Sequence, residues 1–147
     1  MIDLVAAFEA VVDAMGAIGA EYVVVGSTAA AGWGVARATR DVDVVAIMSV
    51  GDVHELLKAL DREALYVPDD DAHRAALTGG SFNVLHTRSG GKVDVFVAQH
   101  SDEFTRSRLR RRVPADVLGV SSWIATAEDV ILAKLRWRLV SRSEIQW

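Results

Sequence analysis

The chain has 147 residues, of which 51% are hydrophobic and 24% are charged, and its formal net charge is −4. This size and this balance are those of an ordinary globular protein, so we expect one domain over residues 1–147. The chain contains no cysteine, which excludes a disulfide framework and a thiolate metal site. The negative charge argues against unspecific binding to nucleic acid, although it is compatible with a local basic patch.

The N-terminal segment and the apolar runs bear on localisation. Residues 1–20 carry acidic side chains early and lack the basic start of a signal peptide. No apolar run approaches the about 18 residues that a membrane-spanning helix needs. Together with the lack of cysteine, these features favour a cytoplasmic protein that does not interact with a membrane.

Hydrophobic periodicity predicts helices and strands through the first half of the chain. The predicted elements are a helix over residues 3–15, a strand over 22–25, a tight turn and short helix over 26–34, and a strand over 41–48. Gly16 and Gly19 are expected after the end of the first helix. Asp52 and Glu55 have the spacing of a helix cap and predict that the next helix begins there.

The second half is richer in predicted strands. The predicted elements are a short strand over residues 65–67, a helix over 69–77, strands over 81–87 and 92–98, two short strands within 109–125, and a final long helix. Two glycines in the connection 88–91 indicate a β-hairpin. Thr126 and Asp129 form a cap signal for the final helix. The predicted fold class is α/β with α+β character, a mixed β-sheet with flanking helices.

Two aspartates interrupt the apolar run of the second predicted strand. Aspartate is depleted in strands, and a buried carboxylate is unfavourable unless it is paired or bound to a metal. Because side chains two residues apart on a strand share a face, Asp41 and Asp43 point to the same side, opposite to Val42 and Val44. Two such carboxylates can hold a divalent cation. The alternative is a strand at the sheet edge with both acids in water.

A third aspartate, Asp94, interrupts a later predicted strand in the same way. It lies in the run Lys92–Val97, with valines on the opposite face. If this strand neighbours the one with Asp41 and Asp43, the three carboxylates form a two-metal site, whereas without metal they repel one another. On its own, Asp94 would be interpreted as a solvent-facing residue of a hairpin.

Gly26 and Ser27 follow the first predicted strand and open the predicted short helix. This geometry presents backbone N–H groups and a hydroxyl to an anion, and glycine lets the backbone approach a phosphate closely. An anion site beside an acidic metal site is what transfer from a nucleoside triphosphate requires. On its own, Gly26-Ser27 would indicate an ordinary turn.

These motifs resemble those of the nucleotidyltransferases of the polymerase-beta superfamily. The family pattern is an apolar strand, Gly-Gly or Gly-Ser, a spacer, Asp-x-Asp or Asp-x-Glu, and a later acid on a strand. The chain has Gly26-Ser27, thirteen residues, Asp41-Val42-Asp43, and then Asp94. The resemblance extends over about residues 20–137, which is most of the chain.

Two further stretches resemble the AbiEii-type branch of this superfamily. Arg37 and Thr39 precede Asp41 in the order Arg-x-Thr-x-Asp, and the final predicted helix, AEDVILAKL, has an acidic start followed by Lys134. Members of this branch often act as parts of toxin–antitoxin pairs. The resemblance therefore implies a cognate toxin or antitoxin as a partner.

The resemblance implies the nucleotidyltransferase fold and the transfer of a nucleoside monophosphate from an NTP to an RNA or protein acceptor. Two Mg²⁺ ions, or Mn²⁺, are the implied cofactors. Asp41 and Asp43 would hold both ions, while Asp94 would hold the catalytic ion and help to deprotonate the acceptor. The implied nucleotide-binding residues are Gly26, Ser27, Arg37, Thr39 and Lys134.

Several residues also have a simpler interpretation. Arg37 could bind a triphosphate or pair with an acid and hold its loop, and Lys134 could be a solvated helix lysine. Trp123 and Trp137 are expected in the core or an interface. A basic cluster is interpreted either as a solvated strand or loop or as an RNA-binding rim, and its members are Arg106, Arg108, Arg110, Arg111 and Arg112.

Two other functions are compatible with the motifs. The chain could be a catalytically silent nucleotide-binding or antitoxin-like module, or a nucleotide-sensing domain of a larger assembly. Three unfavourable carboxylates argue against a silent module, because a protein without turnover has no need to keep them. Transfer of label from an NTP to an acceptor separates the enzyme from both alternatives.

Overall fold

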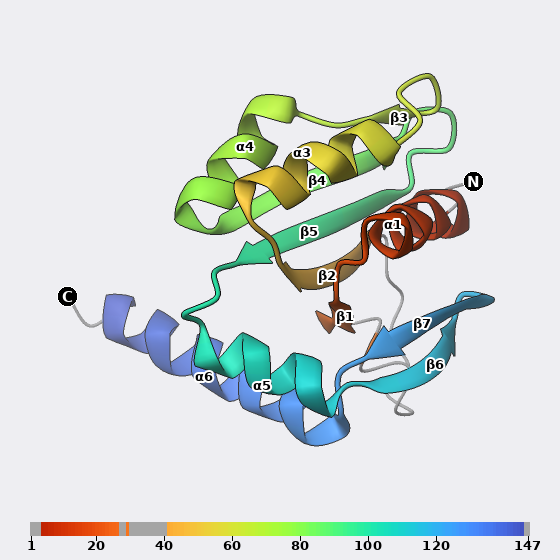
Figure 1. Cartoon of the computed structure of the whole chain (residues 1–147). Coiled ribbons are helices and arrows are strands. Elements are labelled where there is room, and N and C mark those ends of the chain that lie inside the picture. The colour runs from red at the N-terminus through yellow and green to blue at the C-terminus, as the bar shows by residue number, and fades with distance from the viewer. Residues whose placement is uncertain (1–3, 27–28, 30–40, 146–147) are drawn as a thin grey trace.

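The structure is a computed structural model that describes residues 4–26, 29 and 41–145, with side chains as far as residue 139 (Figure 1). In this part of the chain, a seven-stranded mixed sheet is combined with five helices, which confirms the predicted fold class. The elements are α1 Leu4–Ile18, β1 Tyr22–Val25, β2 Asp41–Ile47, α3 Val50–Ala59, β3 Leu65–Tyr66, α4 Asp69–Thr78, β4 Gly80–His86, β5 Lys92–Ala98, α5 Glu103–Arg111, β6 Val113–Val117, β7 Val120–Ile124 and α6 Ala127–Ile145.

The strands of the sheet lie in the order β3-β4-β5-β2-β1-β7-β6. Neighbours are antiparallel, except that β2 is parallel to β5 and β1 is parallel to β7. Strand β2 is therefore central, with β5 on one side and β1 on the other. The register places Asp43 opposite Asp94 of β5 and opposite Val25 of β1.

Helices α1, α3 and α4 cover one face of the sheet and form the main core with it (Figure 1). Every second residue of β2 and β5 points into this core, so Val42, Val44, Val93 and Val95 are completely buried. Burying such a side chain stabilises the fold by roughly 1.5–3 kcal/mol. A shift of the strand register by one residue would replace these valines in the core with charged side chains. The packing of the core therefore determines which face the aspartates occupy.

Among the described residues, the opposite face of the sheet is only partly covered. Leu109 of α5 and Ala125, just before α6, pack on Val23 and Val45 in a second, smaller cluster. Leu109 is the apolar side chain that α5 contributes to this cluster, while most of that helix is polar. The part of this face that carries the aspartates therefore stays accessible.

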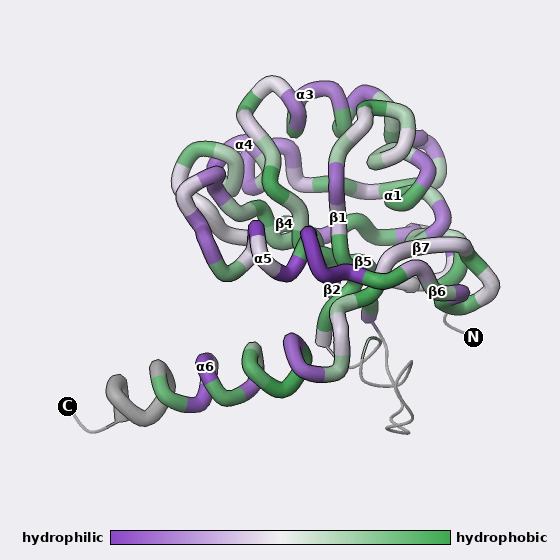
Figure 2. Tube along the Cα trace, turned by 60° about the horizontal axis from the view of Figure 1, so that its bottom comes forward, coloured by the Kyte–Doolittle hydropathy of each residue, from purple (hydrophilic) through white to green (hydrophobic). Residues whose placement is uncertain are grey.

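Helix α5 contacts α6 at both of its ends. Arg111, at the end of α5, pairs with the buried Asp129 near the start of α6 at 2.5 Å. Arg136 of α6 lies over the ring of Phe104 at the start of α5, 4.9 Å from its centre, so the two helices run antiparallel. Figure 2 shows α6 reaching away from the body of the fold. The exposed apolar side chains of α6 are Ile131, Leu132, Leu135, Trp137 and Leu139. None of the described helices is long and apolar enough to cross a membrane.

Elements with a regular apolar period or a clear cap are confirmed. Strands β1 and β2, the β4–β5 hairpin and the β6–β7 pair about Gly119 lie where the sequence predicts them. Helix α4 ends at Thr78, with the N–H of Gly79 bonded to Ala75 O. The Thr126 hydroxyl accepts a hydrogen bond from the Asp129 N–H at 3.1 Å, as expected for the cap of α6.

Two predicted helix ends are wrong. Helix α1 continues through Gly16 to Ile18, and an added Cβ at Gly16 would meet nothing within 4 Å, so this glycine sits at an open position on the helix. Helix α3 begins at Val50 rather than at Val53, because Ser49 and Asp52 form the capping box. The hydroxyl of Ser49 satisfies the Asp52 N–H at 3.1 Å.

The basic cluster is neither a strand nor a loop. Most of it belongs to α5, a helix capped by Asp102, whose carboxylate accepts from the Thr105 N–H at 3.0 Å. Of the two places expected for the tryptophans, a core or an interface, the core is excluded, since Trp123 is 37% and Trp137 is 73% exposed. Trp123 instead packs under the guanidinium of Arg112, 4.6 Å from the ring centre.

Candidate functional site

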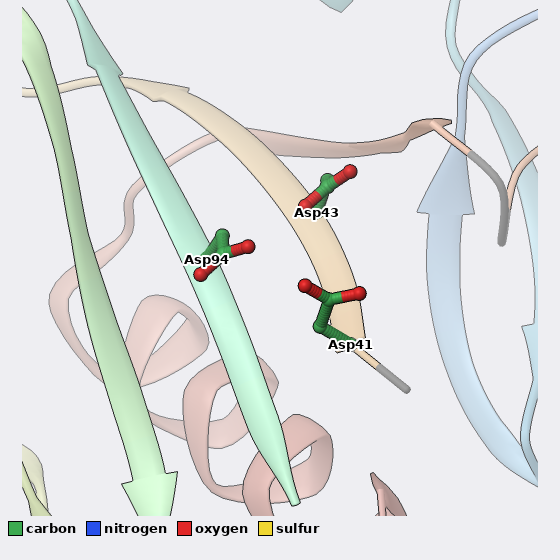
Figure 3. A group of neighbouring side chains, drawn as sticks. All are labelled: Asp41, Asp43 and Asp94. Atoms are coloured by element: carbon green, nitrogen blue, oxygen red, sulfur yellow. The ribbon is translucent and has the colours of Figure 1, made fainter. Parts of the chain in front are cut away.

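Three carboxylates converge on the partly covered face of the sheet (Figure 3). Asp41 and Asp43 project from β2 and Asp94 from the adjacent β5, and one oxygen of each lies within 4.8 Å of the others. Parallel pairing puts Asp43 opposite Asp94, and the two-residue period of the strand puts Asp41 on the same side. The structure therefore brings together the three aspartates that the sequence singled out.

The three side chains fit a hard divalent cation. Carboxylate oxygens are ligands that Mg²⁺ prefers, and opposite ligands of one Mg²⁺ lie about 4.2 Å apart, twice the usual metal–oxygen distance. No more than two of the three ligands can lie opposite each other, so binding one ion would draw the oxygens closer together than the 4.8 Å within which they lie. All three residues are half-buried, so water can complete the coordination. Asp41, Asp43 and Asp94 could thus hold a metal ion.

Burial and mutual repulsion disfavour ionisation of this cluster. Burial raises the pKa of Asp43 to about 6, and the negative charges of Asp94 and Asp41 add to the shift. Burial also raises the pKa of Asp94, while the ammonium of Lys92 opposes that shift. A bound divalent cation would offset both burial and repulsion, because it favours the ionised carboxylates.

Lys92 is a cation already present at the cluster. It lies opposite Asp41 in the register of β2 and β5, two residues before Asp94 on the same strand. Its Nζ is 3.6 Å from Asp41 Oδ2 and 3.5 Å from Asp94 Oδ1. The charge of Asp94 raises the pKa of Lys92, and that of Asp41 contributes less. Lys92 was not among the predicted site residues, although its spacing from Asp94 indicates a shared face.

Gly26 follows β1 directly and lies beside the cluster. Its φ is +73°, in the region that favours glycine, and an added Cβ would lie only 2.5 Å from Asp43 Oδ2. The conformation favours glycine, and an added Cβ would displace the Asp43 carboxylate. The backbone therefore passes next to the carboxylates at the point where the sequence predicts phosphate binding.

A pocket of about 900 Å³ opens beside the cluster, between the sheet and helices α5 and α6. Gly26 and Asp43 line it, as do the apolar side chains of Val45 and Phe96. Phe96 is 40% exposed although it is a large aromatic residue in a strand. The volume lies within the range of small-molecule sites, which are mostly apolar with a few polar groups.

Arg108 is a buried cation in the wall of this pocket. It is 8% exposed, and its Nε has no hydrogen-bond partner among the described residues. Its guanidinium lies over Phe104, 4.6 Å from the ring centre, and one terminal nitrogen donates to Thr105 Oγ1 at 3.4 Å. Burial lowers the pKa of Arg108, an effect that Asp102 and Asp129 oppose.

The predicted nucleotide-binding residues divide into two groups. Gly26 and Lys134 are in the described part of the chain, and both line the pocket, with Lys134 exposed on α6. Ser27, Arg37 and Thr39 lie outside the described residues. Arg108 was considered only as a member of the basic cluster, and its burial depends on how α5 packs on the sheet.

Comparison with known proteins gives similarity at the level of the fold. No protein-family profile and no curated protein sequence matches the chain. Among solved structures, TM1012 from Thermotoga maritima, a proposed nucleotidyltransferase, superposes with a TM-score of 0.68 at 14% sequence identity, over 99% of this chain and 92% of that chain.

Two antibiotic-related proteins are also similar. The lincosamide antibiotic adenylyltransferase LnuA, in a structure with lincomycin bound, has a TM-score of 0.57 at 10% identity and covers 86% of this chain and 83% of its own. The antibiotic-resistance factor ANT(2'')-Ia has a TM-score of 0.51 at 15% identity, over 90% of this chain and 70% of that chain. At these identities the similarity concerns the course of the backbone. The chain therefore has the nucleotidyltransferase fold.

Proposed function

We propose that the protein is a metal-dependent nucleotidyltransferase that moves a nucleoside monophosphate from an NTP to an acceptor. The observation that carries this proposal is the convergence of Asp41, Asp43 and Asp94 beside Gly26 on the accessible face of this fold. Hard carboxylate ligands next to a closely approaching backbone are what a metal-bound triphosphate needs.

The aspartates have separate roles in the proposed reaction. Asp41 and Asp43 would hold two Mg²⁺ ions, or Mn²⁺, and Asp94 would hold the catalytic ion with them. When bound, these ions neutralise the phosphate oxygens and align the attacking group. Asp94 would also accept a proton from the acceptor hydroxyl.

The nucleotide lies between β1 and α6 in this proposal. Gly26 and Ser27 bind the β- and γ-phosphates through backbone N–H groups and the hydroxyl. Arg37, Thr39 and Lys134 complete the nucleotide site, and the position of Lys134 at the pocket supports its part. The remaining pocket, with Phe96 and Arg108 in its wall, is open to the nucleoside or the acceptor.

The acceptor is proposed to be RNA or protein in the cytoplasm. The stretches that resemble the AbiEii-type branch support a place in a toxin–antitoxin system, with a cognate toxin or antitoxin as partner. Within α5, Arg108 is buried and Arg111 is paired with Asp129, so Arg106 and Arg110 are the exposed arginines left to contact RNA phosphates.

Lys92 favours a second candidate function. Its ammonium already neutralises part of the charge of Asp41 and Asp94, so the fold does not depend on metal to relieve their repulsion. With Lys92 neutralising part of their charge, a catalytically silent nucleotide-binding or antitoxin-like module could keep the three aspartates without binding metal. Such a module would bind nucleotide without transferring it.

Incubation with each α-phosphate-labelled NTP, Mg²⁺, total cellular RNA and total cellular protein distinguishes these functions. The enzyme would label a macromolecule, and the label would vanish with chelator and in Asp94→Asn. The silent module would bind nucleotide and label nothing. Thermal unfolding of Asp94→Asn confirms that the loss of label is not a loss of fold.

A further inference from the structure

We propose that Lys92 is the resident counter-cation of the carboxylate cluster and makes metal binding depend on nucleotide. Metal alone would bind weakly, whereas metal together with a triphosphate would bind well. The nucleotide half of this inference rests on the proposed function. The counter-cation half rests on the geometry of β2 and β5 alone.

The position of Lys92 is determined by the two strands rather than by chance contact of a long side chain. The register places it opposite Asp41, and the strand period places it on the same face as Asp94. Its Nζ lies between the two carboxylates, at 3.6 Å and 3.5 Å. The side chain is 37% exposed, so the ion pairs are only partly screened by water.

The two carboxylates that Lys92 contacts are also two of the three that can hold metal. A divalent cation at Asp41 and Asp94 would meet an ammonium only a few ångströms away, and like charges at that distance repel strongly. Lys92 must therefore turn away from the cluster before a cation can use both carboxylates. Its flexible four-carbon stem allows this movement without a change in the backbone.

A metal–triphosphate complex changes the balance because its net charge is negative. The ammonium that leaves the carboxylates can then pair with a phosphate oxygen, and the like-charge repulsion becomes an attraction. Lys92 thus weakens the binding of free metal and strengthens the binding of metal together with nucleotide. Because such coupling is reciprocal, metal strengthens nucleotide binding by the same factor.

The test compares wild type with Lys92→Met in two calorimetric titrations, one with Mn²⁺ alone and one with Mn²⁺ bound to each non-hydrolysable NTP analogue. We expect Lys92→Met to bind free Mn²⁺ roughly tenfold more tightly and the Mn²⁺–nucleotide complex roughly tenfold more weakly. Lys92→Arg keeps the charge and should stay close to wild type in both titrations. Neither measurement requires turnover.

Lys58→Met is the matched control, because Lys58 pairs with Glu55 at 3.7 Å on α3 and its removal changes the net charge equally. It should leave both affinities unchanged. Free Mn²⁺ affinity in Lys92→Met that equals wild type, or that weakens, would overturn the inference. If Lys92→Met binds free Mn²⁺ more tightly but neither protein binds nucleotide, the counter-cation role stands and the proposed function fails.

Discussion

Asp43 is held in the folded protein at a pKa of about 6, well above the 3.8 of an ordinary aspartate. Burial is the main cause, followed by the charges of Asp94 and Asp41. The folded state therefore binds this proton more tightly than the unfolded state does. As the pH rises from about 4 to about 6, Asp43 ionises and the metal-free protein loses stability. Above that range Asp43 is fully ionised, and the loss of unfolding free energy is complete.

Asp43→Asn should remove the destabilisation that the ionised Asp43 carboxylate causes. With chelator at neutral pH, we expect the variant to be more stable by about 1–2 kcal/mol, a figure reduced for solvent screening, which corresponds to a melting temperature higher by about 3–6 °C. The difference should fade towards about pH 4, where Asp43 is protonated in wild type. Thermal unfolding across this pH range measures it, with Asp116→Asn on the exposed part of β6 as control.

In excess Mg²⁺, wild type should be more stable than Asp43→Asn, the reverse of the order expected with chelator. Wild type gains stability by binding the ion, whereas Asp43→Asn lacks one of its ligands. The same melting experiment with Mg²⁺ in place of chelator shows this. A variant that is less stable by the same amount in both buffers would mean that Asp43 is a structural hydrogen-bonding residue.

Gly26 offers a second test at the residue scale. Gly26→Ala places a Cβ 2.5 Å from Asp43 Oδ2 and forces alanine to adopt a φ of +73°. We expect a loss of about 1–3 kcal/mol in unfolding free energy and a weaker stabilisation by Mg²⁺, because Asp43 must move. Gly16→Ala is the matched control: its site lies inside α1 with open space around it, so stability should rise by about 0.5–1 kcal/mol.

Helix α5 depends on one buried charge of its neighbour. Asp129 is 1% exposed, and Arg111 donates to it through Nε at 3.1 Å and through a terminal nitrogen at 2.5 Å. Arg111→Met leaves that carboxylate buried without its cation, and we expect a loss of about 2–3 kcal/mol in urea unfolding. Arg110→Met, on the exposed side of the same helix, should change stability by less than about 0.5 kcal/mol. Equal effects of the two substitutions would contradict a structural role for the pair.

The elements that could be predicted from sequence are those whose local signal agrees with their packing. Strands β2 and β5 alternate valine with charged residues, and one buried face follows directly from that alternation. Helix α5 could not be predicted in this way, because EFTRSRLRR has only two apolar residues and no apolar stripe. Its helical state depends on the Asp102 cap and on packing of Leu109 against the sheet.

Part of the candidate site could also be predicted from sequence. The three aspartates follow from the two-residue period together with the assumption that their strands are neighbours. The contact of Lys92 with Asp41 joins positions far apart in sequence and depends on the parallel register of β2 and β5. The burial of Arg108 likewise depends on how α5 lies on the sheet, which no local pattern contains.

At the scale of the whole molecule, one face of the sheet forms the main core and the other carries the candidate site. The face under α1, α3 and α4 is a continuous apolar core, whereas the opposite face carries the carboxylates, Lys92 and the pocket. A partly covered face tolerates a cluster of like charges that a core would not, since water can still reach it. This division lets one fold keep an acidic site without losing its core.

The central claim is that this site transfers a nucleotidyl group, and the fate of the two ends of the triphosphate tests it most directly. The protein is incubated with Mg²⁺, cellular RNA and protein, and an NTP labelled either at the α-phosphate or at the γ-phosphate. We expect the acceptor to carry label from the α-phosphate only, while label from the γ-phosphate appears in released pyrophosphate. Acceptor labelled from the γ-phosphate, or no acceptor labelled from the α-phosphate of any NTP, would contradict the account.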